Sequence, residues 1–559
     1  MNIILIALII FNINFLSAGD VFLDAMKKEL NVSYEKLKNA EKFPMYFIGY
    51  EAWDSENWWV SSNLGSIKSE MERKQRIISC DIRVGTPDMD STHEIKGVNY
   101  DENSKMTNIS ILPLNDEQAI RSEIWNLTDK TYKDALNRYI RVLTNKQVTA
   151  EEEDKSGDFI IVKTTQSFKK YFEPEIIDKD VIKNMLKKLS SVFKRYDFII
   201  DSSVSFSKEY QNRYIVNSNG SEIVEGERRY RLSYLLVART DDGMDISRYR
   251  NYDFENISEM PLEDKVLSDI YNSIDELKNL LTAKQLEPYT GPAILESKAA
   301  AVFWHEIFGH RVEGHRQKSE SEGQTFAKKI GQSIMPSFIT IYDDPNLKYY
   351  NSKFLNGNYL YDDEGVKSQK AVLVENGVLK GFLMQRVPVL GFKDSNGHGR
   401  RSPGYLTVAR QGNLIVESTK VFPYQTLKKM LIEEIKKSQK PYGLIIKDIE
   451  GGFTFTTRDM PQSYTVLIKY AFKIYPDGKE EVVRGLNMIG TPLQTFSRIV
   501  ATGDDYDVFN GVCGAESGWV NVSAVSPSLL FSEIETEKVQ KSNQKPPILK
   551  PPYIDLEGK

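Results

Sequence analysis

Two histidines and one glutamate in a short apolar segment are the residues best suited to chemistry. His305 and His310 are two of only five histidines in the 559 residues, and Glu306 directly follows the first of them. The preceding residues, 299–304, are alanine-rich and apolar, which favours a helix buried in its domain. Because buried polar side chains need partners, a metal ion held by the imidazoles is the expected partner. The alternative is a pair of satisfied histidines that flank a glutamate by chance.

Zinc is the metal that these residue types predict. Two neutral imidazoles and one further protein ligand leave an open position for a water, whose pKa the zinc lowers towards neutrality. Glu306, next to one ligand, can take the proton of that water and pass it to a leaving amine. We therefore expect a zinc-dependent metallopeptidase in which His305 and His310 bind the metal and Glu306 is the general base.

The spacing of the two histidines predicts a local distortion of their helix. In the common zincin pattern the histidines are four residues apart and share one face of the helix. Here they are five apart, which places them roughly 140° apart on an ideal helix, too far round for one ion. The helix must therefore widen by one residue, as in a π-bulge, or end near Gly309. Glycine suits either form, since it adopts backbone angles that other residues resist.

The residues close to the histidines leave the third ligand open. His315 stands five residues beyond His310, at the offset of the third histidine of a metzincin. That pattern needs its second histidine at position 309, where this chain has glycine, so the metzincin pattern is excluded. Glu313 and Glu320 are the candidate oxygen ligands.

Several short motifs follow the histidine segment in a fixed order. They are Ile330-Gly331, Tyr342-Asp343-Asp344, Tyr361-Asp362-Asp363-Glu364-Gly365, residues 372–381, Asn396-Gly397-His398-Gly399-Arg400-Arg401, Gly451-Gly452, Gly490-Thr491-Pro492 and Asn510-Gly511-Val512-Cys513-Gly514. With the histidine segment, this order resembles the C-terminal region of the TldD/PmbA metallopeptidases, from about Gly291 to Ser532. The signature of that family is His-Glu-x-x-x-His followed much later by a cysteine ligand. The N-terminal part resembles the first domains of the family less distinctly.

The resemblance implies a role for each residue that matches the signature. It makes His305 and His310 metal ligands, Glu306 the catalytic residue and Cys513 the third ligand. The expected cofactor is one zinc ion per subunit.

The residues around Cys513 are compatible with that role. Cys513 lies between Gly511 and Gly514, where backbone can approach a site closely, and a thiolate is a strong zinc ligand. The alternatives are a buried structural cysteine or a disulfide with Cys80, the only other cysteine, which an extracytoplasmic chain could form. Cys80 itself lies in a strand-like run and is expected to pack in a core.

Two arginines could contact the substrate, and the three remaining histidines are not expected to bind the metal. Arg400 and Arg401 could stabilise an oxyanion or hold a substrate carboxylate, and the alternative is that they pair with Asp362 or Glu364. The histidines not expected to bind the metal are His93, His315 and His398.

The resemblance also implies a dimer, either of identical subunits or with a related TldD/PmbA-type subunit, that encloses the active site. Such a site admits unfolded or short peptides, and extended peptides commonly bind by adding a strand to a sheet edge. The net charge of −5 gives no electrostatic case for nucleic acid. The rival functions are a non-catalytic TldD/PmbA-like subunit that binds peptide or stabilises a partner, and an extracytoplasmic metal-binding or surface protein with a Cys80–Cys513 disulfide.

Periodicity predicts an α+β fold, with N-terminal mixed α/β domains followed by a β-rich C-terminal catalytic domain. Helical spacing covers residues 20–42, 132–148, 180–196, 263–281 and 423–437, and strand-like alternation covers 46–84, with breaks at 54–55 and 63–65, and most of 292–534. Turns are expected at 217–220 and 241–243. The expected domains are residues 19–285, with a break between two subdomains near 150–180, then 286–536, the metallopeptidase domain, and 537–559, a Lys/Pro-rich tail.

Residues 1–18 predict a signal peptide. An apolar stretch from Ile3 to Leu16 is followed by Ser17-Ala18, a small-residue cleavage site. The stretch is too short to span a bilayer comfortably, so we expect an exported protein, periplasmic or extracellular. The alternative is a membrane anchor formed by the uncleaved N-terminus.

Overall fold

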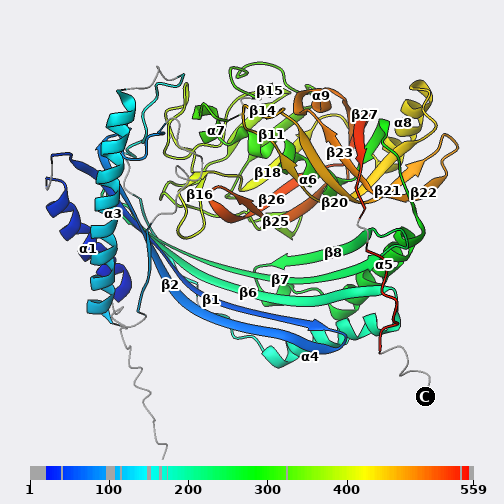
Figure 1. Cartoon of the computed structure of the whole chain (residues 1–559), viewed down its shortest axis with the longest axis horizontal. Helices are drawn as coiled ribbons and strands as arrows, with labels where there is room; N and C mark the ends of the chain where they lie inside the picture. Colours follow the sequence, from blue (N-terminus) through cyan, green and yellow to red (C-terminus); the bar gives the residue numbers. More distant parts are fainter. Residues whose placement is uncertain are drawn as a thin grey trace, which may run out of the picture.

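The computed structural model describes residues 20–39, 42–95, 108–113, 116–147, 153–162, 166–172, 174–322, 325–541 and 544–552. The expected signal peptide, residues 1–18, lies outside these ranges. No helix within them has both the length and the apolar character needed to cross a membrane. Helices combine with long strands, and the C-terminal region is rich in strands, so the α+β prediction is confirmed (Figure 1).

Long strands form an N-terminal sheet that curves beneath the C-terminal region (Figure 1). Its order is β3-β2-β1-β6-β7-β5, with β4 on β2 and β8 on β7. Strands from both sides of residues 150–180 therefore share one sheet. The break expected at 63–65 connects β1 to β2, and the turns expected at 217–220 and 241–243 connect β6 to β7 and β7 to β8. The bounds are β1 Met45–Asn63, β2 Ser66–Thr86, β3 Met89–Asp90, β4 Ile109–Ile111, β5 Ser167–Lys170, β6 Ile199–Asn217, β7 Glu222–Arg239 and β8 Asp245–Phe254.

The break predicted at Asp54 and Ser55 is wrong. β1 runs through both residues and pairs there with β2 on one side and β6 on the other. Asp54 also forms an ion pair with its cross-strand neighbour Arg76. A residue type that favours turns is therefore held in a strand by neighbours on both sides.

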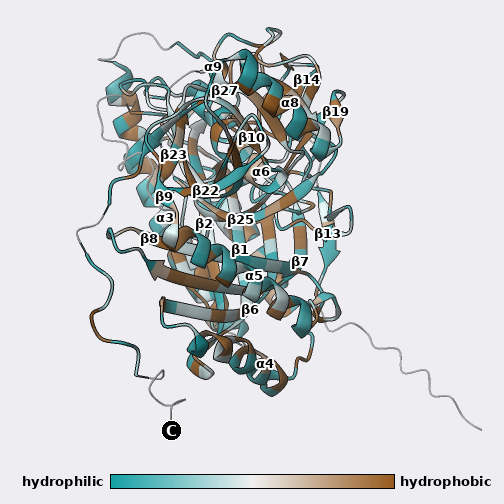
Figure 2. Cartoon of the chain, turned by 90° about the vertical axis from the view of Figure 1, so that its right-hand side faces the viewer, coloured by the Kyte–Doolittle hydropathy of each residue, from teal (hydrophilic) through white to brown (hydrophobic). Residues whose placement is uncertain are grey.

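Helices pack on this sheet in two groups, each with its own apolar core (Figure 1). α1 (Val21–Leu37) and α3 (Glu117–Lys146) form one group, and α4 (Lys179–Ser191) and α5 (Glu263–Thr282) form the other. Asp20, Asp116 and Asp178 cap α1, α3 and α4, because each carboxylate accepts a backbone N–H of the first turn. Figure 2 shows hydrophilic and hydrophobic residues side by side on α4, α5 and α8, as expected of amphipathic helices. Short 3-10 helices are η1 Val192–Arg195 and η2 Ile257–Glu259.

In the described part of the chain, the C-terminal region contains a nine-stranded and a six-stranded sheet, besides two sheets of two strands each. α6 (Ser297–Ile307) packs against both of the larger sheets. One has the order β19-β24-β27-β10-β20-β21-β22-β9, with β23 on β21 and β27, and the other has the order β15-β14-β11-β18-β26-β25. β27 ends at Lys538, so the first two residues of the expected tail lie in a strand. The strand bounds are β9 Lys284–Gln285, β10 Thr290–Leu295, β11 Ile339–Asp343, β12 Tyr349–Tyr350, β13 Lys353–Phe354, β14 Ala371–Glu375, β15 Val378–Leu379, β16 Gly399–Arg400, β17 Val408–Ala409, β18 Asn413–Ser418, β19 Val421–Phe422, β20 Gly443–Thr454, β21 Tyr464–Ile474, β22 Glu480–Arg484, β23 Leu486–Gly490, β24 Ile499–Gly503, β25 Asp507–Ala515, β26 Gly518–Ser526 and β27 Leu529–Lys538. The further helices are η3 Gly309–Val312, α7 His315–Lys318, α8 Tyr424–Lys437 and α9 Pro492–Ser497.

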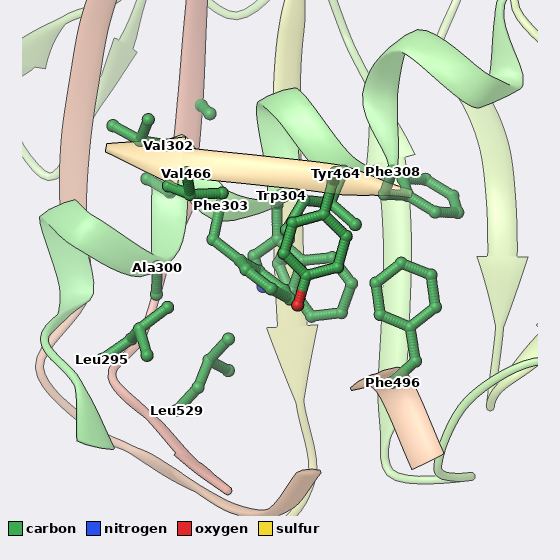
Figure 3. Packing of buried hydrophobic residues seen from close by; sticks show 14 of the residues in the cluster. Leu295, Ala300, Val302, Phe303, Trp304, Phe308, Tyr464, Val466, Phe496 and Leu529 are labelled. Atoms are coloured by element: carbon green, nitrogen blue, oxygen red, sulfur yellow. The ribbon is translucent and has the colours of Figure 1, made fainter. Parts of the chain in front are cut away.

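Aromatic side chains hold α6 in the core of this region (Figure 3). The ring of Trp304 stacks on Phe496 with centroids 5.3 Å apart, and Phe303 contacts Tyr464 edge-on. Alanines at 299–301 let the sheets approach the helix closely, and all three are buried. The last turn of α6 is therefore held in a fixed position by close packing.

Candidate metal centre

α6 ends between the two histidines, so they lie in different local structures. His305 lies in the last turn of α6, which ends at Ile307, and His310 lies in the 3-10 helix η3. The imidazole ring centroids are 5.1 Å apart. The predicted distortion is confirmed, and it takes the form of a helix end near Gly309 rather than a π-bulge.

Gly309 is needed for space and not for an unusual backbone angle, since its φ is not positive. A Cβ at this position would lie 1.9 Å from Oε1 of Gln411. Gln411 is only 1% exposed, and its Nε2 donates a hydrogen bond to the carbonyl oxygen of His305 at 3.2 Å. The absence of a side chain at Gly309 therefore lets Gln411 hold the end of α6.

We expect Gly309→Ala to destabilise the protein by about 1–3 kcal/mol, the usual cost of overpacking a buried site. The added methyl group must displace Gln411, which loses its hydrogen bond to His305. Chemical denaturation measures the change in the free energy of unfolding. Gly451→Ala is a matched control, because a Cβ at Gly451 would meet only Glu306, at an ordinary contact distance of 3.6 Å. Equal losses in the two variants would contradict this explanation.

The hairpin of β25 and β26 brings Cys513 to the histidines. Cys513 lies opposite Val520 in this hairpin, and both side chains are buried. Sγ of Cys513 lies 3.4 Å from Nε2 of His310, and one donor atom from each of His305, His310 and Cys513 lies within 4.8 Å of the others. Both cysteines are free thiols, and Cys80 packs in the N-terminal core with α1 and α3. The structure thus brings together the three residues that are expected to bind the metal.

These three side chains shift one another's pKa values. Burial would raise the pKa of Cys513, but His310, His305 and Arg410 outweigh it and hold that pKa well below its usual value. Burial would lower the pKa of His310, but Cys513 and Glu313 hold it well above its usual value. The pKa of His305 is also raised, against the effect of burial, chiefly by Cys513. Cys513 therefore favours the thiolate form, which is the form that binds metals.

The donor set fits a zinc ion. Zinc prefers imidazole nitrogen and thiolate sulfur, and three protein donors are the number found in catalytic zinc sites. Nδ1 of His305 is buried and has no hydrogen-bond partner among the described residues. A buried nitrogen without a partner costs free energy. Coordination of a metal ion or a hydrogen bond to an ordered water would recover it.

Glu306 lies beside this donor set on α6. The backbone of Gly452, in β20, lies beside its side chain, since a Cβ at Gly452 would be 3.3 Å from Cγ of Glu306. Burial raises the pKa of Glu306, and the neighbouring His305 and His310 offset this only in part. A carboxylate with a raised pKa is a better proton acceptor near neutral pH.

The two candidate oxygen ligands lie outside the donor set. Glu313 accepts a hydrogen bond from Nδ1 of His310 at 3.1 Å, on the opposite side of the ring from Cys513. Glu320 accepts a hydrogen bond from the backbone N–H of Glu153 at 3.0 Å.

The arginines of the Gly-His-Gly-Arg-Arg turn join parts of the protein to one another. Arg400 donates to the backbone carbonyls of Gln411 and Asn521, both at 2.7 Å. Arg401 forms an ion pair with Glu51 of the N-terminal sheet. Within the described residues, neither arginine forms an ion pair with Asp362 or Glu364, the partners considered from the sequence. The backbone N–H of Arg401 instead donates to Asp363 of this acidic turn at 2.6 Å. Both arginines also line a polar cavity of about 180 Å³ between that sheet and β26.

The other histidines have protein partners. His398 is fully buried and hydrogen-bonded to Asn396 and Asp343, and His93 is hydrogen-bonded to Asp158. His315 is hydrogen-bonded to Glu516.

Arg410 and Gln411 were missed in the sequence. Arg410 donates to the backbone carbonyl of Cys513, and Gln411 donates to that of His305. The available signal was a polar run, residues 410–413, that leads into the apolar strand β18. Nothing in that run indicates which distant segments it contacts.

Family models match two stretches of the chain. One, described as the PmbA/TldA metallopeptidase C-terminal domain, matches residues 288–538, and the central domain of the same family matches residues 172–277. The chain belongs to the TldD/PmbA family of metallopeptidases. The first of these stretches contains every residue of the donor set, together with Glu306.

Similar proteins of the TldD/PmbA family are named metalloproteases. The chain is 27% identical to a metalloprotease of Methanocaldococcus jannaschii, over 63% of this chain and 78% of that protein. It is 24% identical to the zinc metalloprotease TldD homolog of Saccharolobus solfataricus, over 64% of this chain and 78% of that protein. The crystal structure of TldE from Thermococcus kodakarensis matches with a TM-score of 0.58 and 15% identity, over 92% of this chain and 100% of that one, which supports the fold.

We expect the affinity of this TldD/PmbA-family site for zinc to rise with pH through and beyond about 6.5, the ordinary pKa of histidine. The pKa values of His310 and His305 are raised, so protons compete with the metal for the imidazoles above that pH as well. Cys513, with its lowered pKa, contributes little to this competition. Chelator competition at a series of pH values measures the effect. An affinity that is constant above pH 6.5 would contradict the raised pKa values.

Proposed function

We propose that this chain is a zinc-dependent peptidase that hydrolyses peptide bonds of unfolded or short peptides, with Glu306 as the general base. The observation that supports this most directly is the convergence of His305, His310 and Cys513 beside Glu306 in one buried group. The donor atoms come from segments 203 residues apart. Apolar residues would pack a core better than these two histidines and one cysteine, so packing does not explain why they meet there.

The protein supplies the proton transfer and the fixed geometry. When bound, zinc would act as a Lewis acid that lowers the pKa of a water and polarises the peptide carbonyl. The carboxylate of Glu306 takes a proton from the attacking water and delivers it to the amine of the leaving peptide. The packing of α6 and the adjacent backbone of Gly452 hold that carboxylate in place.

An open strand edge beside Glu306 supports an extended peptide as the substrate. β20 pairs with β21 from Gly443 to Thr454, with register irregularities between Ile446 and Gly452, but its pairing with β10 ends at Ile446. Among the described strands, no other partner lies on that side of β20 from Asp448 to Thr454. Gly452 lies within this part of β20, so a peptide added there as a strand would pass close to Glu306.

The most informative experiment is to incubate the zinc-loaded protein with a mixture of unfolded peptides and to sequence the products. We expect cleavage within unstructured peptides and none within folded proteins. A protein that carries stoichiometric zinc but leaves every peptide uncut would instead favour the alternative, a non-catalytic subunit that binds peptide or stabilises a partner.

Assembly and location are part of the same proposal. We propose a homodimer, or a heterodimer with a related TldD/PmbA-type subunit, that works outside the cytoplasm after cleavage of residues 1–18. The family membership supports the first statement, and the apolar N-terminal segment supports the second. Light scattering of the purified protein and N-terminal sequencing of the mature chain test them.

A further inference from the structure

A buried carboxylate lies behind His310 and is held by two arginines. Glu313 has no exposed surface, and its Oε1 accepts the hydrogen bond from Nδ1 of His310. Its Oε2 accepts a hydrogen bond from Nε of Arg316 at 2.9 Å, and Nε of Arg410 lies 3.6 Å from Oε1. This contact fixes the ring of His310, because Nδ1 carries the proton and Nε2 is left to face Cys513.

The same arginines reach the hairpin that carries Cys513. Arg410, 1% exposed, donates from Nη2 to the carbonyl oxygen of Cys513 at 2.8 Å and from Nη1 to Oγ of Ser517 at 2.9 Å. Arg316 donates from Nη2 to Glu516 at 2.9 Å. Each guanidinium therefore spans the gap between residue Glu313 and the turn 513–518.

This arrangement connects two ligands that the chain separates by 203 residues. Metal donors must be held within about 0.5 Å of their productive positions, and a β-hairpin turn does not fix itself relative to a distant helix. The planar fork of arginine suits this task, because its donors point in fixed directions and can bind two partners at once.

We propose that Glu313 and Arg410 are positioning residues of the metal centre. Glu313 fixes the orientation and tautomer of His310, and Arg410 holds the backbone of Cys513 at a set distance from that carboxylate. This inference rests on the proposed metal centre and adds the residues that align His310 with Cys513.

The test compares the full-length wild type with Glu313→Gln, Arg410→Gln and Arg410→Lys. Zinc affinity is measured by chelator competition, and the cobalt-loaded proteins are examined for thiolate-to-cobalt charge-transfer absorption, which reports Cys513 as a ligand. We expect Glu313→Gln and Arg410→Gln to bind zinc about 10- to 100-fold more weakly, and Arg410→Gln to lose charge-transfer intensity. Arg410→Lys keeps the buried charge but lacks the fork, so it should fold and still bind zinc more weakly than the wild type.

Arg311→Gln is the matched control. Arg311 follows His310 directly and is 2% exposed, but its contacts are Thr325, Gln462 and the carbonyls of Phe455 and Ser463. The Arg311→Gln variant should retain the wild-type affinity for zinc and, when loaded with cobalt, the wild-type charge-transfer absorption.

Two results would overturn the proposal, and they differ in what else they affect. A folded Arg410→Lys or Arg410→Gln with wild-type affinity and absorption, together with an unaffected Glu313→Gln, removes the positioning roles and leaves the metal centre intact. A wild-type protein that binds neither zinc nor cobalt removes the metal centre itself.

Discussion

Glu306→Gln is expected to lower kcat/KM for peptide cleavage by about 10²- to 10⁴-fold while the affinity for zinc stays close to that of the wild type. Glutamine has the shape of glutamate and fits the same space beside Gly452, but it cannot take a proton from water. The packing of α6 depends on Phe303 and Trp304, which the substitution leaves in place. Cleavage of an unstructured peptide and chelator competition for zinc measure the two quantities.

Glu296→Gln is the control for this substitution. Glu296 immediately precedes α6, at the opposite end of the helix, and its Oε1 accepts a hydrogen bond from Tyr424. Like Glu306, it is a largely buried carboxylate with a raised pKa, but it lies away from the donor set. The Glu296→Gln substitution should leave the rate of peptide cleavage nearly unchanged. If Glu306→Gln also cleaved at the wild-type rate, the general base would have to be another group.

Cys513→Ala should weaken zinc binding by more than about 100-fold, since loss of a direct ligand exceeds the 10- to 100-fold effect of losing a residue that orients one. Two imidazoles would remain as the protein donors. The pKa of His310 should also fall, because Cys513 is the largest influence that raises it against burial. Chelator competition gives the zinc affinity, and histidine titration by NMR gives the direction of the pKa change.

Cys80→Ala separates this effect from the general cost of removing a buried thiol. Cys80 is 1% exposed, and burial raises its pKa, so it is a packed thiol whose thiolate form is disfavoured. Zinc affinity in Cys80→Ala should match that of the wild type. Equal losses of affinity in the two variants would indicate that the cysteines act through stability and not through the metal.

The histidine motif and its helix could be predicted because their signals are local. The apolar residues before His305 and the five-residue spacing to His310 are sufficient to predict a buried helix with a distortion. The helix predicted from Tyr132 begins earlier, at Glu117, although Ile120, Ile124 and Leu127 already repeat at helical spacing. The local pattern of the sequence therefore extends the helix to these residues.

Other features depend on contacts that no local pattern encodes. The sequence favoured Gly309 for its backbone freedom, whereas its role is to admit Gln411, which lies 102 positions further along the chain. Glu313 had the right chemistry for a metal ligand, but the 3-10 turn places it at Nδ1 of His310, on the far side of the ring. Cys513 was selected only through the family resemblance, because nothing near the histidines specifies a partner so far along the chain.

The distance along the chain between the two halves of the metal centre has a consequence during protein synthesis. The ribosome makes His305, Glu306 and His310 long before the hairpin that contains Cys513, which lies 203 residues beyond His310. A nascent chain interrupted between these points has Glu306 and two imidazoles but lacks the thiolate. Because domains commonly fold as they are completed, hydrolytic activity would arise only after β25 and β26 have joined the finished sheet. Prematurely released fragments should therefore be inert towards the unfolded polypeptides around them.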